Sequence, residues 1–115
     1  MKRFSLIALI ISAVTLFSYC SSSKKAALKV PLLTYEANIQ QLVTEKCSPC
    51  HIPAKGGNKL ALHEFEAVKA SIDPVIDRIS RQPHEKGFMP LKKARLSDST
   101  INVFKQWKAD GMLAK

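Results

Sequence analysis

The stretch VTEKCSPCHIPAKGG, residues 43–57, places Cys47, Cys50 and His51 in the order C-x-x-C-H. Residues 34–46 lead into this motif, and their apolar side chains recur at the i, i+4, i+7, i+8 spacing of one helix face. The prolines and glycines within and after the motif predict a loop. The sequence therefore predicts that two thiols and an imidazole gather where a helix ends and a loop begins.

The rest of the chain predicts further short helices. The spacing of apolar residues indicates helices over 34–46, 60–72, 73–82 and 97–111, with an irregular, charged segment before the last of them. Sustained alternation of apolar and polar residues, which is typical of strands with one buried face, does not occur. The predicted fold class is all-α. The candidate core residues are Tyr35, Ile39, Leu42, Val43, Leu62, Phe65, Val68, Ile72, Ile101, Phe104 and Trp107.

Residue types that cap helices support these boundaries. Thr34 precedes the first helix, and Ser97 or Asp98 precedes the last, where a side-chain oxygen accepts a hydrogen bond from a free backbone N–H. Pro74 is expected at the first helical position of the third helix, where the missing N–H of proline costs little. Gly111 follows the last helix, where a glycine commonly ends one. The last helix is therefore marked at both ends.

The N-terminal segment has the layout of a secretory signal. Lys2 and Arg3 precede an apolar run over residues 4–17, and small polar residues follow it. We predict a signal peptide over residues 1–19 and export across the bacterial inner membrane. The alternative is an uncleaved anchor helix, and in both cases the two positive charges stay inside while the domain crosses.

Cys20 stands directly after the apolar run and is followed by SSSKK. This arrangement resembles the bacterial lipoprotein signal, in which that cysteine becomes the lipidated first residue of the mature chain. We therefore predict lipidation of Cys20, a flexible lipid-proximal tether over 20–33, and a domain over 34–115. The expected location is periplasm-facing or cell-surface and lipid-anchored; ordinary cleavage nearby would instead leave a soluble periplasmic domain.

Three chemistries use a C-x-x-C-H arrangement. A redox dithiol of the thioredoxin type needs a βαβ setting, which an all-α chain lacks. A zinc site needs two further ligands beside Cys47 and Cys50, and His51, His63 and His84 do not form a second pair at the usual spacing. Covalent haem needs only what is present, because two sulfurs three positions apart reach the vinyl-derived carbons on one porphyrin edge and the adjacent histidine reaches the iron.

A haem site also needs a group for the sixth position of the iron or leaves that position open. The segment GFMPLKKARL, residues 87–96, offers Met89 before Pro90, just ahead of the last helix. Over residues 34–112 the chain resembles the class I c-type cytochromes: a helix leading into C-x-x-C-H, short middle helices, a Met-Pro loop and a last helix with an aromatic face. It has Leu91 where many relatives have a second proline.

The resemblance implies a small cytochrome c fold in which the N- and C-terminal helices cross and short middle helices surround one covalent haem c. Cys47 and Cys50 would form the thioethers, His51 would be the proximal iron ligand, and Met89 would be the distal one. The crossing is expected near Ile39 or Val43 on the first helix and Phe104 or Trp107 on the last. The implied function is one-electron transfer, with no enzymatic activity; the alternative is a haem-based small-ligand sensor or the redox subunit of a larger enzyme complex.

Several side chains keep a second interpretation. His84 is the rival of Met89 as distal ligand, and Met89 is otherwise a core residue. His63 is expected on the surface and Met112 at the periphery. Trp107 is expected to pack in the core, with an indole N–H that could reach a haem propionate.

The chain is basic, with a formal net charge of +9. Lys86, Lys92, Lys93 and Arg95 surround Met89, and they form either a solvated surface or a face that docks an acidic redox protein. The membrane is the second predicted partner, through lipidated Cys20. Nucleic acid is not a predicted partner, because the sequence has no basic helix interleaved with aromatics, no phosphate-binding glycine loop and no repeat.

Overall fold

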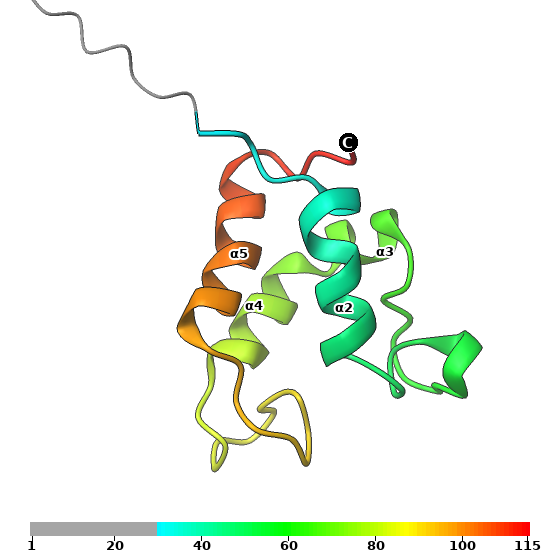
Figure 1. Ribbon diagram of the computed structural model, residues 1–115. Helices are drawn as coiled ribbons and strands as arrows, with labels where there is room; N and C mark the ends of the chain where they lie inside the picture. The colour runs from blue at the N-terminus through cyan, green and yellow to red at the C-terminus, as the bar shows by residue number, and fades with distance from the viewer. Residues whose placement is uncertain (1–29) are drawn as a thin grey trace, which may run out of the picture. The chain divides into compact units, whose positions relative to one another are not determined.

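The computed structural model describes residues 30–115, so the predicted signal peptide and Cys20 lie outside the described residues. Within that range the chain is mostly helical and has no strand, only one isolated parallel bridge between Thr34 and Leu113. The prediction of an all-α fold is confirmed for this part (Figure 1). No helix in it combines the length and apolar character needed to cross a membrane. The helices are η2 (Tyr35–Ile39), α2 (Gln40–Lys46), η3 (Pro53–Lys55), α3 (Phe65–Ala70), α4 (Ile72–Ser80) and α5 (Asp98–Ala109).

The predicted caps occupy both ends of the fold. The Thr34 hydroxyl accepts a hydrogen bond from the backbone N–H of Ala37 at 3.3 Å, and η2 continues directly into α2. The Ser97 hydroxyl accepts from the backbone N–H of Thr100 at 3.2 Å, so Ser97 caps α5. Gly111 follows α5 with a φ of +92°, a conformation that glycine adopts without strain.

The two ends of the domain are bound to each other. The backbone N–H of Leu33 donates to the Asp110 carboxylate at 2.8 Å, and that of Tyr35 donates to the Leu113 carbonyl at 2.8 Å. The Trp107 indole N–H donates to the same Leu113 carbonyl at 3.0 Å. The C-terminal segment thus folds back and uses the indole N–H, the donor that the sequence left open for a haem propionate, while Trp107 packs in the core as predicted.

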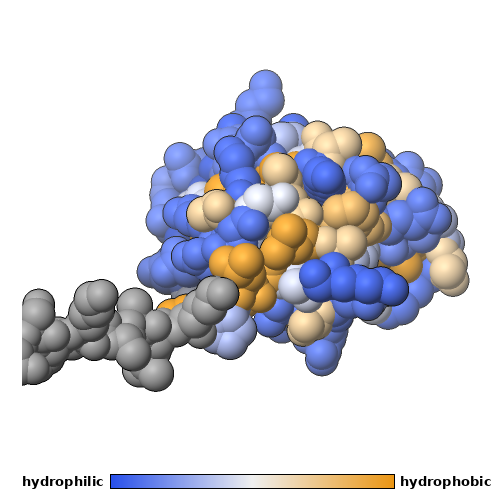
Figure 2. Space-filling model, turned by 90° about the horizontal axis from the view of Figure 1, so that it is seen from above, coloured by the Kyte–Doolittle hydropathy of each residue, from blue (hydrophilic) through white to orange (hydrophobic). Residues whose placement is uncertain are grey.

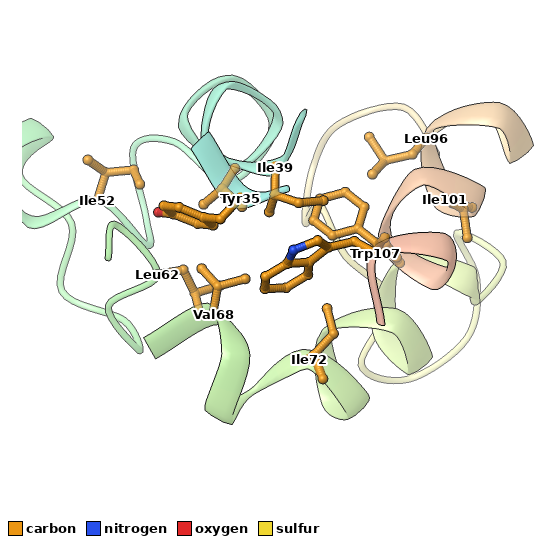
Figure 3. Close-up of a cluster of buried hydrophobic side chains, with 12 residues drawn as sticks. Tyr35, Ile39, Ile52, Leu62, Val68, Ile72, Leu96, Ile101 and Trp107 are labelled. Carbon is orange, nitrogen blue, oxygen red and sulfur yellow. The ribbon is translucent and has the colours of Figure 1, made fainter. Parts of the chain in front are cut away.

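Helix η2 packs on α5, so the first and last helical segments contact each other. Ile39, Val43, Phe104 and Trp107 are all at most 1% exposed and belong to one core cluster. Figure 3 shows Trp107 at the centre of this cluster, with Ile39 on one side of it. The contact between the N- and C-terminal helices is confirmed and is built on the side chains that the sequence indicated.

Three aromatic rings join α3 to this contact. The ring centroids of Tyr35 and Phe65 lie 5.5 Å apart, those of Phe65 and Trp107 lie 6.3 Å apart, and those of Tyr35 and Trp107 lie 6.2 Å apart. Edge-to-face and tilted arrangements of this kind add to the stabilisation that burial supplies. In addition, Lys108 of α5 forms an exposed ion pair with Asp73 of α4.

The second predicted helix begins later than expected. Residues 60–64 are not helical, and α3 starts at Phe65. The reason is tertiary: the backbone N–H of Leu62 donates to the His51 carbonyl at 2.9 Å, and that of Lys59 donates to the Cys50 carbonyl at 3.1 Å. The next helix, α4, begins at Ile72, one residue before the predicted start. Pro74 is therefore the third helical residue, and the prediction that it is the first is wrong.

The surface is largely hydrophilic, with a limited apolar patch on the face seen from above (Figure 2). Leu32 and Leu113 are among the exposed large apolar residues, at 58% and 37%. Isolated apolar residues are normal on protein surfaces. Leu32 and Leu113, taken singly, therefore need no separate explanation.

Candidate functional site

A mainly apolar pocket of about 350 Å³ lies between the end of α2, α4 and the segment before α5. Its walls include Cys47 and Cys50, the predicted haem-attachment cysteines, and His51 and Met89, the predicted proximal and distal ligands. Its volume falls within the range of roughly 300–1,000 Å³ that is typical of ligand pockets. Two segments far apart in the sequence thus bring their chemistry to one cavity.

The cysteine motif continues the helical winding of α2. The backbone N–H of Cys47 donates to the Val43 carbonyl at 2.9 Å, and that of His51 donates to the Cys47 carbonyl at 3.1 Å. Cys47 is half-buried, Cys50 is exposed, and both carry free thiols. One extra turn beyond α2 therefore presents two thiols and the imidazole to the same pocket.

The imidazole of His51 is held by one backbone carbonyl. Its Nδ1 lies 2.7 Å from the Leu60 carbonyl oxygen, which can only accept, so Nδ1 carries the proton and donates it. In the neutral ring this leaves the lone pair on Nε2. Hydrogen bonding of the second ring nitrogen to a carbonyl is the usual way in which proteins orient a metal-binding histidine. Sequence reasoning missed Leu60, because its role belongs to the backbone and leaves no trace in residue type.

Gly57 lets the following loop lie against this turn. A Cβ at Gly57 would lie 2.6 Å from the Cys50 carbonyl oxygen and closer still to that of Pro49. The backbone N–H of Gly57 also donates to the Ile52 carbonyl at 3.1 Å. The absence of a side chain is therefore required for the loop to close on the cysteine motif.

Met89 is half-buried and is anchored to α4, since its backbone N–H donates to the Arg78 carbonyl at 3.1 Å. The preceding residue, Phe88, is 5% exposed and fixes the segment to the interior. His84, the rival ligand, is exposed and does not line the pocket. The structure therefore brings Met89, and not His84, to the cavity that contains His51.

The other residues with two interpretations lie away from the pocket. His63 is exposed, as expected, and its Nε2 lies 3.5 Å from a Glu64 carboxylate oxygen. Met112 is half-buried and packs against the core. Among residues 30–115 no three His, Cys, Asp or Glu side chains are grouped so that they could hold a metal ion. His63 and His84 thus do not complete the set of ligands that zinc would need with the two cysteines.

Burial raises the pKa of the Cys47 thiol to about 11, and the nearby positive charge of Lys93 opposes this shift. Thiol–disulfide exchange proceeds through the thiolate and typically uses cysteines of lowered pKa. A thiol that remains protonated at neutral pH is a weak nucleophile for that chemistry. Cys47 therefore lacks the lowered pKa that is typical of the attacking thiol of a redox dithiol.

The pocket mouth combines positive charge with exposed apolar surface. Leu60 and Leu91 line the pocket and are 61% and 65% exposed. Lys59 and Lys93 also line it and are exposed. Of the basic residues predicted to surround Met89, Arg95 is paired with an acidic residue, since it forms an ion pair with Asp98 at 2.8 Å.

Comparison with known proteins gave no match to any family model, curated protein or solved structure.

Proposed function

We propose that this chain is a one-electron carrier with a single haem c bound covalently through Cys47 and Cys50. In this proposal His51 is the proximal ligand and Met89 the distal one. The observation that carries it is the convergence of these four side chains on one apolar pocket, with Nδ1 of His51 already bonded to a carbonyl.

The residues present fit such a group in their chemistry. The two thiols lie three positions apart on one turn, and the histidine keeps Nε2 for a metal. The mainly apolar walls suit a porphyrin, and Leu60 and Leu91 are apolar side chains at the mouth against which it would pack. When bound, haem supplies one reversible electron at its iron.

The chain's own contribution is to fix and shield that site. The buried cluster around Trp107 and Phe104 holds α5 against η2 and α4, and α4 in turn supplies one wall of the pocket. A methionine sulfur favours the reduced metal, so Met89 would raise the potential. The contact of the first and last helices, with short helices between them, is the architecture expected of a small cytochrome c fold, which we propose for residues 34–115.

The basic, partly apolar mouth supports docking of an acidic redox protein. Lys59 and Lys93 lie beside exposed Leu60 and Leu91, so charge would steer the partner and apolar contact would hold it. The rate of electron exchange with an acidic partner should fall as salt rises. A rate that does not change with salt would contradict this part of the proposal.

Export and lipidation of Cys20 complete the proposal. The tether would hold the domain at a periplasm-facing or cell-surface membrane, and a Cys20→Ser variant should be released from it. Globomycin should block processing, and the mature chain should carry a lipid-sized mass increment at Cys20. A mature protein with a free Cys20 thiol would contradict this assignment.

Covalent attachment is the decisive experiment for the cofactor. The chain is produced in a bacterial host that performs c-type haem maturation, and the denatured protein is assayed for haem by in-gel peroxidase staining and intact mass. We expect haem to remain with the denatured wild-type chain and to be lost after joint substitution of Cys47 and Cys50 by alanine, whereas Cys20→Ser should retain it. Loss of haem from the denatured wild type would overturn the proposal.

A further inference from the structure

Lys93 connects the cysteine motif with the segment that contains Met89. Its Nζ donates a hydrogen bond to the backbone carbonyl of Ser48 at 2.6 Å, across 45 positions of sequence. Ser48 is the residue between the first cysteine of the motif and Pro49. Lys93 lies four residues after Met89 and lines the same pocket as the motif.

Local structure on both sides directs this contact. The backbone N–H of Lys93 donates to the Pro90 carbonyl at 3.3 Å, which closes a turn, and Lys92 within it has a φ of +61°. On the other side the Ser48 hydroxyl donates to the Thr44 carbonyl, which ties Ser48 to the end of α2. The donor thus comes from an ordered turn, and the acceptor is fixed to a helix.

We propose that Lys93 is a positioning residue that holds the Met89 segment against the Cys47–His51 turn. The inference rests on the proposed function, since it concerns how Met89 is kept available to an iron bound by His51. The backbone of Met89 is anchored to α4 through the Arg78 carbonyl. Lys93 adds an anchor to the cysteine motif itself, so the segment is held on two of the elements that line the pocket.

Loss of the second anchor has a specific consequence. Without the ammonium group, the segment keeps its tie to α4 but loses its tie to the motif, and Met89 leaves the pocket more often. A hydrogen bond from a charged donor is moderately strong, but this one is exposed to solvent, so we expect roughly a five-fold increase in the fraction of chains with Met89 displaced. The core around Trp107 is not involved, so global folding should change less than ligation.

Three variants isolate the effect. Lys93→Met keeps the length and apolar stem and removes the donor, whereas Lys93→Arg retains a donor. Lys92→Met is the matched control, because it removes the neighbouring exposed charge. It also leaves the strain of a positive φ unchanged, since lysine and methionine both carry a Cβ.

Each variant is measured as the matured full chain. The first readout is the denaturant midpoint at which the near-infrared sulfur-to-iron band disappears, compared with the midpoint for loss of helical circular dichroism. The second is the rate of carbon monoxide binding to the reduced protein. For Lys93→Met we expect the band to be lost at lower denaturant, carbon monoxide binding about five-fold faster, and a smaller shift in the helical midpoint. Lys93→Arg and Lys92→Met should stay near the wild type.

Two outcomes would overturn the inference alone: Lys93→Met indistinguishable from Lys92→Met, or ligation and helical midpoints that shift in parallel. The second outcome would make Lys93 a general stabilising residue. Absence of the band in a wild type that does bind haem would overturn both the inference and the assignment of Met89. Absence of covalent haem in the wild type would overturn the whole proposed function, so the failures are distinguishable.

Discussion

Substitution of Gly57 by alanine tests how closely the loop is packed on the cysteine motif. Gly57 does not have a positive φ. By backbone entropy alone, an alanine in a compatible conformation would stabilise the fold by about 0.4–1 kcal/mol. The new Cβ, however, would lie 2.6 Å from the Cys50 carbonyl oxygen, whereas relaxed carbon–oxygen contacts are about 3.3 Å or longer.

The clash should determine the sign of the effect. The opposing atoms are backbone oxygens of Pro49 and Cys50, which cannot rotate away as a side chain would. Overpacking of this kind costs about 1–3 kcal/mol. After the entropic gain is subtracted we expect a net loss of about 1.3 kcal/mol, which corresponds to a melting temperature lower by roughly 5–10 °C for a domain of this size. Because the Cys50 carbonyl must move, haem attachment should fall as well.

Thermal and urea unfolding of the matured protein, with haem content per chain, form the assay. Gly56→Ala is one control, because a Cβ there meets open space but sits at a φ of +81°, which costs about 1 kcal/mol without a clash. Asn58→Ala is the second control, an exposed neighbour expected within about 0.5 kcal/mol of the wild type. The reasoning would be refuted if Gly57→Ala were as stable as the wild type or more stable, with unchanged haem content.

Three further outcomes follow from the fold. Trp107 is fully buried, so Trp107→Ala should cost about 3–5 kcal/mol in urea unfolding, and a cost under about 1 kcal/mol would contradict its central place. The exposed ion pair of Lys108 with Asp73 should be worth only about 0.2–1 kcal/mol in a double-mutant cycle and should weaken with salt; a larger, salt-insensitive coupling would be inconsistent with its exposure. Burial, and secondly the charge of Glu64, raise the pKa of Tyr35 above 10.0. The neutral phenol is therefore favoured in the fold, and the stability that it contributes is complete below pH 10 and is lost as pH rises through the raised pKa. Tyr35→Phe should flatten that alkaline decline, measured by unfolding from pH 9 to 12, and an identical decline in both proteins would refute the assignment.

Helix ends and core residues could be predicted from the sequence because their causes are local. Thr34 and Ser97 cap helices through their own side chains, and apolar spacing identified Ile39, Phe104 and Trp107 as interior residues. The two cysteines predicted to attach the haem and the two predicted iron ligands, His51 and Met89, line one pocket, although residue spacing alone could not place Met89 opposite a motif so far away in the sequence. Haem attachment by the cysteines and iron ligation by His51 and Met89 stay predictions.

What could not be predicted depends on backbone contacts between distant segments. The helix expected from residue 60 begins at Phe65, because the intervening chain bonds to the Cys50 and His51 carbonyls instead. The carbonyl of Leu60 orients His51, and that of Leu113 occupies the indole N–H of Trp107. A carbonyl is the same in every residue, so composition and periodicity contain no signal for these contacts.

The optical spectrum of the matured protein, oxidised and reduced, tests the central claim most directly. We predict a low-spin c-type spectrum with a weak near-infrared sulfur-to-iron band in the oxidised state, and reduced bands that carbon monoxide does not rapidly change. Met89→Ala should abolish the near-infrared band, whereas Met112→Ala, the matched change at a methionine outside the pocket, should preserve it. A high-spin spectrum, or a band that survives loss of Met89, would contradict the account.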